Sequence, residues 1–270
     1  MTAASSRFWL WRLPAIAATA ATILFAAGFA IALRGAAGRP LGQPPPPPSR
    51  APLVRGQAAA SVLLVLGDSL ARGTGDEAGR GFGGDVLDEL KRRGPVDVAN
   101  LAVNGAESDE VLDLVRREGV RRIASASRWI LLSVGGNDLS HAAPRPGAQN
   151  ASPLESVSRS RARFAANLRE ILANLREANP NAPIRLLGLY DPFEDADAAR
   201  AVPARLGASV ILNWNDVIQA TALGAGDTLV VPTFDLFERR PDRLALDRFH
   251  PNRAGYAVIA ARVIQTLPPS

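Results

Sequence analysis

The sequence predicts a three-layer α/β sandwich, in which helices cover both faces of a five-stranded parallel sheet. Short apolar runs recur between residues 58 and 270, and stretches with helical character separate them. A continuous apolar run is typical of a strand that is buried on both faces, as the strands of parallel sheets are. Strands that alternate with helices along a chain pair in parallel. The order of the segments therefore predicts the α/β class.

Five segments are predicted to be strands. The first, residues 61–67, has five consecutive apolar positions from Val62 to Leu66 and ends in a glycine. Enrichment in Val, Ile and Leu favours a strand for a run this short. The other four strands are predicted at residues 96–102, 128–136, 184–190 and 228–234.

The segments between the strands are predicted to be helical. Ser108, followed by Asp109 and Glu110, gives one helix an acidic first turn. Asn179-Pro180 ends a long helix, because the residue before a proline disfavours helical geometry. Pro251 is expected in the first turn of the closing helix. The predicted helices lie at residues 83–93, at 108–120, within 152–180, partly within 196–224, and at 251–267.

Residues 15–33, which follow a short basic and aromatic flank at 1–14, are uncharged and almost wholly apolar. As a helix they would extend ~28 Å, close to the thickness of a bilayer's hydrocarbon core. We expect a single-pass transmembrane anchor in the cell membrane. The alternative is a signal sequence that is cleaved, because Arg7 and Arg12 form a basic start and small residues follow the apolar run. Either way, we expect the C-terminal part to lie outside the cytoplasm.

Residues 34–57 are predicted to form a proline-rich linker, and residues 58–270 a single domain. Five consecutive prolines at 44–48 favour an extended polyproline II spacer. The chain has a net charge of +5, but residues 1–57 hold six arginines and no acid. The remaining residues therefore carry 25 basic and 26 acidic side chains, a net charge of −1. The basic tail suits anionic lipid headgroups, and no nucleic-acid partner is expected.

Residue counts exclude several kinds of site. The sequence has no cysteine, which excludes a disulfide scaffold and a thiol nucleophile. It has two histidines, His141 and His250, which argues against a zinc site built on histidine and cysteine. We therefore expect no metal and no cofactor.

Polar residues follow each predicted strand. In open α/β sheets, ligands bind outside the carboxyl ends of the strands, so these residues are candidates for one site. They are Asp68-Ser69 after the first strand, Asn104-Gly105 after the second, Asn137-Asp138 after the third, Asp191 after the fourth, and Asp247 with His250 after the fifth.

This set contains the groups that a serine nucleophile needs. Ser69 requires a base, and His250 is the natural candidate because histidines are so few. Asp247 lies three residues earlier, close enough to orient the imidazole across a tight turn. A tetrahedral intermediate also needs donors for its oxyanion. The candidates are the N–H groups of Ser69 and Gly105 and the side-chain amide of Asn137.

The blocks that hold these residues resemble the GDSL, or SGNH, hydrolase family. They are GDSL around Ser69, NLAVNGAES around Gly105, GGND around Asn137, and DRFHP with Asp247 and His250. They stand in the family's order between about residues 61 and 267, and are most similar to the bacterial lipase/acylhydrolase type, which includes the thioesterase and lysophospholipase I group. The resemblance implies a flavodoxin-like SGNH hydrolase fold and ester hydrolysis without a metal.

The sequence therefore predicts a serine esterase or acylhydrolase that works through an acyl-enzyme intermediate. Lipid, lysophospholipid, thioester and O-acetyl substrates all remain open. The alternative function is a catalytically silent or ligand-binding flavodoxin-like module on a membrane stalk. A flavodoxin-like module that binds a cofactor or nucleotide would need a glycine-rich phosphate loop after the first strand, which GDSLARGTG does not match.

Several residues near the blocks have plainer interpretations. Ser69 alone would pass for a turn residue, and Asp68 is interpreted as a structural cap. Asp138 is ambiguous and is not assigned a catalytic role. His141 is expected to be solvated, and Trp214 is expected to pack in the core.

Overall fold

The computed structural model describes residues 60–142, 153–192 and 201–268. The predicted flank at 1–14, apolar segment at 15–33 and linker at 34–57 lie outside the described residues. Within the described ranges, no helix is both long enough and apolar enough to cross a membrane.

A five-stranded sheet forms the centre of the domain, and all of its strands are parallel. The strand order is β2-β1-β3-β4-β5. The chain therefore adds β2 on one side of β1 and then adds β3, β4 and β5 in turn on the other side. The strands are β1 (Ser61–Gly67), β2 (Val96–Asn100), β3 (Ser127–Ser133), β4 (Ile184–Leu187) and β5 (Thr228–Val231). The predicted α/β class and all five strands are confirmed.

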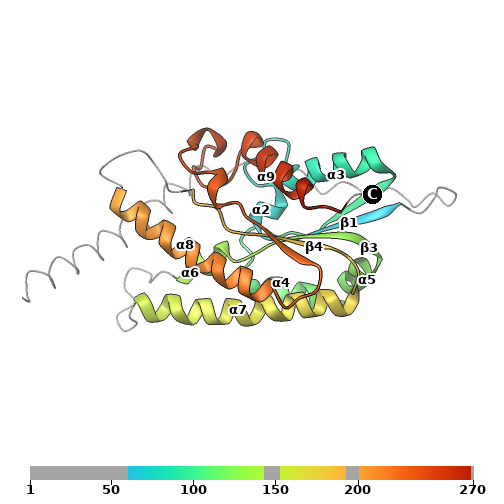
Figure 1. Cartoon of the computed structure of the whole chain (residues 1–270), viewed down its shortest axis with the longest axis horizontal. Helices are drawn as coiled ribbons and strands as arrows, with labels where there is room; N and C mark the ends of the chain where they lie inside the picture. Colours follow the sequence, from blue (N-terminus) through green and yellow to red (C-terminus); the bar gives the residue numbers. More distant parts are fainter. Residues whose placement is uncertain (1–59, 143–152, 193–200, 269–270) are drawn as a thin grey trace, which may run out of the picture.

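Helices cover both faces of the sheet. On one face lie α3 (Gly81–Arg93) and α9 (Arg253–Gln265), as Figure 1 shows. On the other lie α4 (Ser108–Arg116), α5 (Glu118–Ala126), α7 (Pro153–Ala178) and α8 (Ala201–Ala222). Two short helices, α2 (Ser69–Arg72) and α6 (Gly136–Ala142), follow β1 and β3 directly, and two 3₁₀ turns, η2 (Phe234–Leu236) and η3 (Pro241–Arg243), precede α9.

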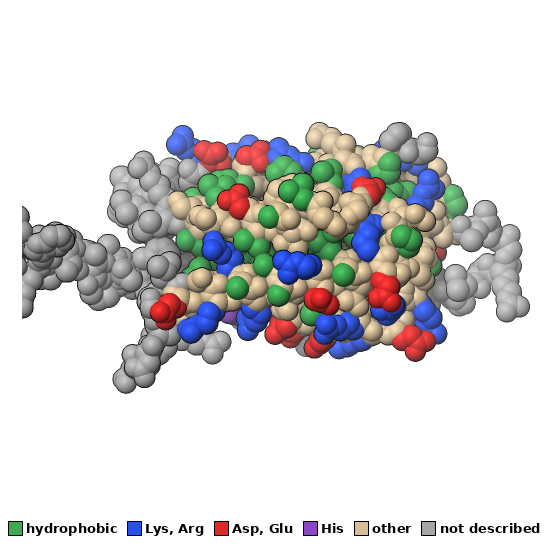
Figure 2. Space-filling model, turned by 60° about the horizontal axis from the view of Figure 1, so that its bottom comes forward, with side chains coloured by type: hydrophobic (Ala, Val, Ile, Leu, Met, Phe, Trp, Pro, Cys, Tyr) green, Lys and Arg blue, Asp and Glu red, His purple; other side chains and the backbone are tan. Residues whose placement is uncertain are grey.

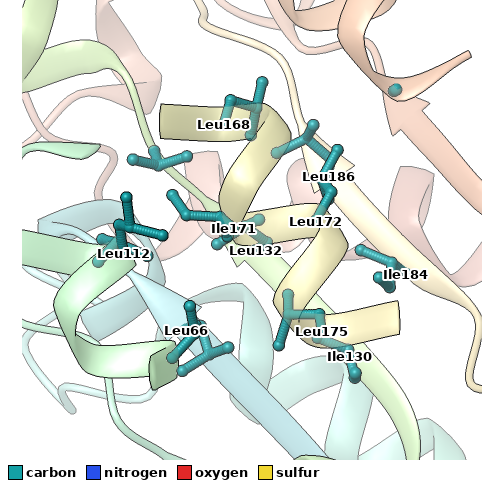
Figure 3. Packing of buried hydrophobic residues seen from close by; sticks show 14 of the residues in the cluster. Leu66, Leu112, Ile130, Leu132, Leu168, Ile171, Leu172, Leu175, Ile184 and Leu186 are labelled. Atoms are coloured by element: carbon teal, nitrogen blue, oxygen red, sulfur yellow. The ribbon is translucent and has the colours of Figure 1, made fainter. Parts of the chain in front are cut away.

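The sheet separates two apolar clusters. Successive side chains of a strand point to opposite faces. Leu64 and Leu66 of β1 therefore belong to the cluster beneath α4 and α7, whereas Leu63 and Val65 belong to the cluster beneath α3 and α9. All four are fully buried, and complete burial of such a side chain stabilises the fold by about 1.5–3 kcal/mol. Figure 3 shows the first cluster, in which leucines of α7 pack on residues of β1, β3 and β4.

The outer surface of the α7 layer carries interspersed acidic and basic side chains (Figure 2). Some form ion pairs between helices, such as Arg121 with Glu177 at 2.9 Å. This mixture fits the near-neutral charge that the sequence assigns to residues 58–270.

Four strands end earlier than predicted. β3 ends at Ser133 because the chain turns at Gly135, which has a φ of +114°, and Gly136 already begins α6. β5 ends at Val231 because Pro232 follows and has no N–H for the ladder. β4 ends at Leu187, three residues before the predicted end, and β2 ends at Asn100, two residues early.

Two helix predictions were wrong in detail. The helix expected at 108–120 is two helices, because Arg117 is extended, with φ −66° and ψ 132°. This break changes the direction of the helix axis, so that Val120 and Ala124 of α5 pack in the same apolar cluster as α4. Pro251 does not lie in the first turn of the closing helix. Asn252 caps α9 by accepting a hydrogen bond from the N–H of Gly255, and Pro251 instead bridges to Leu244.

Candidate active site

The segments that carry the predicted site residues meet at the carboxyl ends of β1, β2 and β3. The N–H of Asp68 donates to the carbonyl of Ser133 at 3.0 Å, which places the end of β1 beside the end of β3. The N–H of Val103 donates to the carbonyl of Gly67 at 2.8 Å, which places the loop after β2 beside the same point. Ser69 begins α2 there.

A continuous chain of hydrogen bonds links Ser69, His250 and Asp247. The Nε2 atom of His250 lies 2.9 Å from the Oγ atom of Ser69, although the two residues are 181 positions apart. The Nδ1 atom of His250 lies 2.6 Å from the Oδ2 atom of Asp247. This is the geometry that a serine nucleophile, a base and an orienting carboxylate require.

The turn from Asp247 to His250 is stabilised by the carboxylate itself. The Oδ1 atom of Asp247 accepts hydrogen bonds from the N–H groups of Phe249 and His250, both at 3.0 Å. Arg248, which lies between Asp247 and Phe249, has a φ of +56°, a left-handed conformation that few side chains adopt. Partial burial alone would raise the pKa of Asp247, but hydrogen bonds from the His250 ring and from the Phe249 N–H lower it on balance. Asp247 is therefore ionised at neutral pH.

Residues that the sequence did not reveal support His250. The hydroxyl of Tyr190 donates to the carbonyl of Phe249 at 2.6 Å. The ring of Phe249 meets the imidazole edge-on, with centroids 5.1 Å apart. A Cβ atom on Gly75 would lie 2.9 Å from the Cβ of His250, so this position must be glycine for His250 to sit where it does. The only sequence signal for these contacts is the glycine at position 75, shortly after α2.

Asp68 caps the helix that carries Ser69, which confirms its interpretation as a structural cap. Its Oδ1 atom accepts the N–H of Leu70 at 3.1 Å and the hydroxyl of Ser133 at 2.7 Å. Burial raises the pKa of Asp68 to about 6, although the hydrogen bonds from Ser133 and Leu70 and the nearby His250 oppose the rise.

The predicted oxyanion donors are Ser69 itself and two residues, Gly105 and Asn137, on segments that contact the neighbours of Ser69. The N–H of Ser69 is in the first turn of α2, where N–H groups have no partner within the helix. Gly105 has a φ of +78° with open space beside its Cα, so it is the conformation rather than crowding that favours glycine. The Nδ2 atom of Asn137 donates to the carbonyl of Ala106 at 2.9 Å. An amide NH₂ has two hydrogens, so one N–H of Asn137 remains for a ligand.

Thr74 ties the Gly105 loop to the segment that follows Ser69. Its hydroxyl donates to the Oδ1 atom of Asn104 at 2.9 Å. The carbonyl of Thr74 in turn accepts the hydroxyl of Tyr256 at 2.6 Å. The loop after β2 is therefore held beside α2 by side chains as well as by the sheet.

Three further residues that the sequence analysis singled out lie outside the chain of hydrogen bonds. His141 is half exposed and is paired with Glu107, whose Oε1 atom lies 2.6 Å from its Nδ1 atom. Trp214 is 1% exposed and its ring lies 5.3 Å from that of Phe164, which confirms that it packs in the core. Asp191 is buried as well. In the described parts of the chain, no cluster of three or more His, Cys, Asp or Glu side chains could hold a metal ion.

Stability is expected to depend on pH through Asp68. Its folded pKa of about 6 exceeds the usual 3.8, so the folded state holds the proton more tightly. The corresponding stability is fully present below pH 3.8 and is lost as pH rises through about 6. The gap amounts to about 3 kcal/mol. Asp68→Asn removes this titration, so its free energy of unfolding, measured in urea, should rise relative to the wild type between pH 4 and pH 7.5.

The matched control for this prediction is Asp113→Asn, because Asp113 is exposed on α4. Its stability should follow the wild type at both pH values. If Asp68→Asn also runs parallel to the wild type, Asp68 is ionised with its ordinary pKa, and burial does not govern it.

Two bacterial proteins are similar in sequence to this chain. It is 28% identical over 214 residues to YpmR of Bacillus subtilis, an uncharacterised protein, covering 76% of this chain and 81% of that protein. It is 24% identical over 221 residues to thioesterase 1/protease 1/lysophospholipase L1 of Escherichia coli, covering 78% and 86% of the two chains.

Solved structures show the same fold. A lipase from a goat rumen metagenome superposes with a TM-score of 0.63 at 22% identity, covering 76% of this chain and 96% of the lipase. TesA superposes with a TM-score of 0.58 at 20% identity, covering 77% and 99%. The acetylxylan esterase Axe2 of Geobacillus stearothermophilus gives 0.56 at 20% identity, covering 76% and 94%.

The family model described as GDSL-like Lipase/Acylhydrolase matches residues 65–258. The match begins within β1 and ends within α9, so it takes in Ser69, Asp247, His250, the end of β1 and the other four strands of the sheet. Since it covers most of the chain, the protein belongs to the GDSL-like lipase/acylhydrolase family of hydrolases.

Proposed function

We propose that the protein hydrolyses carboxylic esters through an acyl-enzyme on Ser69. The observation that carries this proposal is the hydrogen-bonded chain from Asp247 through His250 to the Oγ atom of Ser69. A hydroxyl with that partner can lose its proton as it attacks. Family membership supports the same class of reaction.

In the first half of the reaction, the Oγ atom of Ser69 attacks the ester carbonyl carbon while its proton passes to Nε2 of His250. The carbonyl oxygen becomes an oxyanion, which the N–H groups of Ser69 and Gly105 and the amide of Asn137 would hold. When the intermediate collapses, the bond to the alcohol breaks and His250 returns the proton to the leaving oxygen.

In the second half, water replaces the alcohol. His250 accepts a proton from the water as its oxygen attacks the acyl carbon, and the proton then returns to Oγ as the acid leaves. Asp247 keeps Nδ1 of His250 protonated, which leaves Nε2 as an acceptor in both halves. No further group is needed to balance the protons.

Asn137→Ala is expected to lower kcat by about 10²–10³, the usual effect of removing one oxyanion donor. KM should change much less, because the oxyanion forms only as the reaction proceeds. Steady-state kinetics on p-nitrophenyl acetate measure both constants. Unchanged kcat would mean that the hydrogen bond from Asn137 to the Ala106 carbonyl is its whole role.

Lipid, lysophospholipid, thioester and O-acetyl esters are all proposed as substrate classes. The names of the compared proteins include lipase, thioesterase, lysophospholipase and acetylxylan esterase. Hydrolysis of an acyl group is common to these activities, and the same Ser69 chemistry would serve each. A panel of such esters, assayed on the purified protein, would separate them.

The alternative is a silent or ligand-binding module that does not turn over esters. The Asp247–His250–Ser69 chain supports the enzyme instead, since a binding module has no need of an aligned base. Turnover of p-nitrophenyl acetate that Ser69→Ala removes would exclude this alternative. No turnover of any ester by the wild type would favour it.

We also propose that residues 15–33 tether the domain to the cell membrane, with the catalytic part outside the cytoplasm, or direct its secretion after cleavage. The support is the sequence pattern of this segment. In Figure 1, β1 begins at the end of the sheet opposite to α2, so the linker would join far from Ser69. Cell fractionation and protease treatment of intact cells would test the placement. Cytoplasmic, protease-protected protein would contradict it.

A fragment of residues 58–270 is expected to fold and to hydrolyse small esters. All five strands and the Ser69, Asp247 and His250 side chains lie within it. Circular dichroism and p-nitrophenyl acetate turnover, compared with the full chain, would measure both properties. An unfolded or inactive fragment would mean that residues before 58 contribute to the domain.

A further inference from the structure

Asp138 is a fully buried acid that the proposed reaction does not use. It follows Asn137 in α6, and its carboxylate contacts the first residue of α4, Ser108. Ser108 comes three residues after Gly105. Asp138 therefore joins the two segments that would supply oxyanion donors to Ser69.

The contacts at α4 satisfy its first turn. The N–H of Ser108 donates to the Oδ2 atom of Asp138 at 2.9 Å, and the hydroxyl of Ser108 donates to Oδ1. N–H groups at the start of a helix have no partner within it, and a carboxylate there also interacts favourably with the helix dipole. Asp138 thus caps α4 from another part of the chain.

Two side chains of α7 also hold Asp138 and Ser108 in place. The Oγ atom of Ser160 donates to the backbone carbonyl of Asp138 at 2.9 Å. The Nδ2 atom of Asn167 donates to the hydroxyl of Ser108 at 3.0 Å. Asp138 and Ser108 are therefore held against each other and against the long helix that supports both segments.

Burial works against the charge of Asp138. It raises the pKa of this carboxyl, as does the nearby Glu107, while the two hydrogen bonds from Ser108 lower it. The cost of removing a carboxylate from water is offset only while those two bonds are made. The carboxylate therefore favours the arrangement in which α6 and the start of α4 are in contact.

We propose that Asp138 is a positioning residue for the oxyanion hole, which fixes Asn137 relative to Gly105 through its two hydrogen bonds to Ser108. The inference rests on the proposed function of Ser69. Asn137 makes the parallel contact itself, from Nδ2 to the carbonyl of Ala106. Together the two residues hold the Gly105 loop to α6 at three points.

Loss of this contact should act on kcat rather than on KM. Oxyanion donors must lie 2.7–3.1 Å from the place where charge develops. A displacement of about 1 Å at a reacting group costs on the order of 10²-fold in rate. Ground-state binding of the ester depends far less on these donors.

Asp138→Asn is the variant that tests the proposal. Its amide oxygen can keep the bond from the Ser108 N–H, but its NH₂ then faces the Ser108 hydroxyl, which already accepts from Asn167. The hydroxyl proton is left without the acceptor it had. In the full-length protein, we expect kcat on p-nitrophenyl acetate to fall about 10- to 100-fold with KM nearly unchanged.

Asp109→Asn is the matched control. Asp109 is an exposed acid in the first turn of the same helix, and its carboxylate accepts a local hydrogen bond from the N–H of Glu110. Both variants weaken the charge at the start of α4, but only Asp138→Asn changes a contact with α6. Asp109→Asn should therefore keep the wild-type kcat. Rates are expressed per Ser69 that a fluorophosphonate can label, which removes any contribution from unfolded protein.

A double variant separates a positioning role of Asp138 from a general loss of structure. If Asp138 acts through the oxyanion hole, adding Asp138→Asn to Asn137→Ala should lower kcat much less than it does in the wild type. If the two losses multiply in full, or if Asp138→Asn leaves kcat unchanged, the proposal is overturned.

Ser108→Ala keeps the backbone N–H and removes only the hydroxyl. It should reproduce the fall in kcat, and it serves where Asp138→Asn does not fold.

Failure of the inference can be told apart from failure of the proposed function. If the wild type hydrolyses esters and Ser69→Ala does not, the function stands and the variants of Asp138 and Ser108 decide the inference. If Ser69→Ala retains activity, the function itself fails, and with it the assignment of Asp138.

Discussion

Ser69→Ala is expected to abolish ester hydrolysis while leaving the fold intact. The Oγ atom is the group that would form the acyl-enzyme, and it contacts the Nε2 atom of His250 at 2.9 Å. Without it, only direct attack by water remains, and comparable sites lose on the order of 10⁶ in kcat. Turnover of p-nitrophenyl acetate measures the loss, and circular dichroism checks the fold.

Ser125→Ala is the control for this experiment. Ser125 is exposed on α5, and its hydroxyl donates to the carbonyl of Arg122 within the same helix. That variant should have the wild-type rate and should be labelled by a fluorophosphonate. Ser69→Ala should not be labelled, and label found at another serine of the wild type would overturn the assignment of the nucleophile.

The sheet could be predicted from the sequence because its strands are buried on both faces. β1 and β3 have no polar side chain through their middles, from Val62 to Leu66 and from Trp129 to Leu132. A strand that faces helices on both sides has to be apolar at every position, which leaves a signal that local sequence alone shows. The edge strand β2 is weaker evidence, since Asp97 and Val98 are both exposed.

The ends of the elements could not be predicted as well, because tertiary contacts decide them. Only Gly119 near Arg117 hints at a break in the sequence, yet the chain is extended at Arg117 so that α5 can turn toward the sheet. α2 and α6 have only 4 and 7 residues, too few for a helical period to be visible. α9 begins at Arg253, after Pro251, because the side chain of Asn252 caps it at Gly255 and also donates to the carbonyl of Leu244 across the turn.

The candidate site was visible because its main residues stand in short blocks directly after strands. His250 and Asp247 are three residues apart, and the sequence brings them together without help from the fold. The residues that hold these segments in place could not be predicted, because their partners are far away in the sequence. Tyr190 contacts Phe249 from 59 residues away, and Asp138 contacts Ser108 from 30 residues away. Only the fold brings such pairs together, and each residue alone looks ordinary.

Asp247→Asn is expected to lower kcat by about 10⁴ while the fold persists, the size of effect known for the equivalent change in other serine hydrolases. The Oδ1 atom of Asp247 accepts two backbone N–H groups, those of Phe249 and His250. In the variant, the amide oxygen must take that position, because an NH₂ group would face two donors. The NH₂ group then replaces Oδ2 and faces Nδ1 of His250.

That arrangement reverses the tautomer of His250. An NH₂ group donates to Nδ1, so the ring proton moves to Nε2, which lies against the Oγ atom of Ser69 and can no longer accept its proton. Asp242→Asn is the control, because Asp242 is exposed nearby and pairs with Arg240 instead. Its kcat should match that of the wild type. A loss of less than about 10-fold in Asp247→Asn would show that some other acceptor orients His250, since a reversed tautomer removes the base altogether.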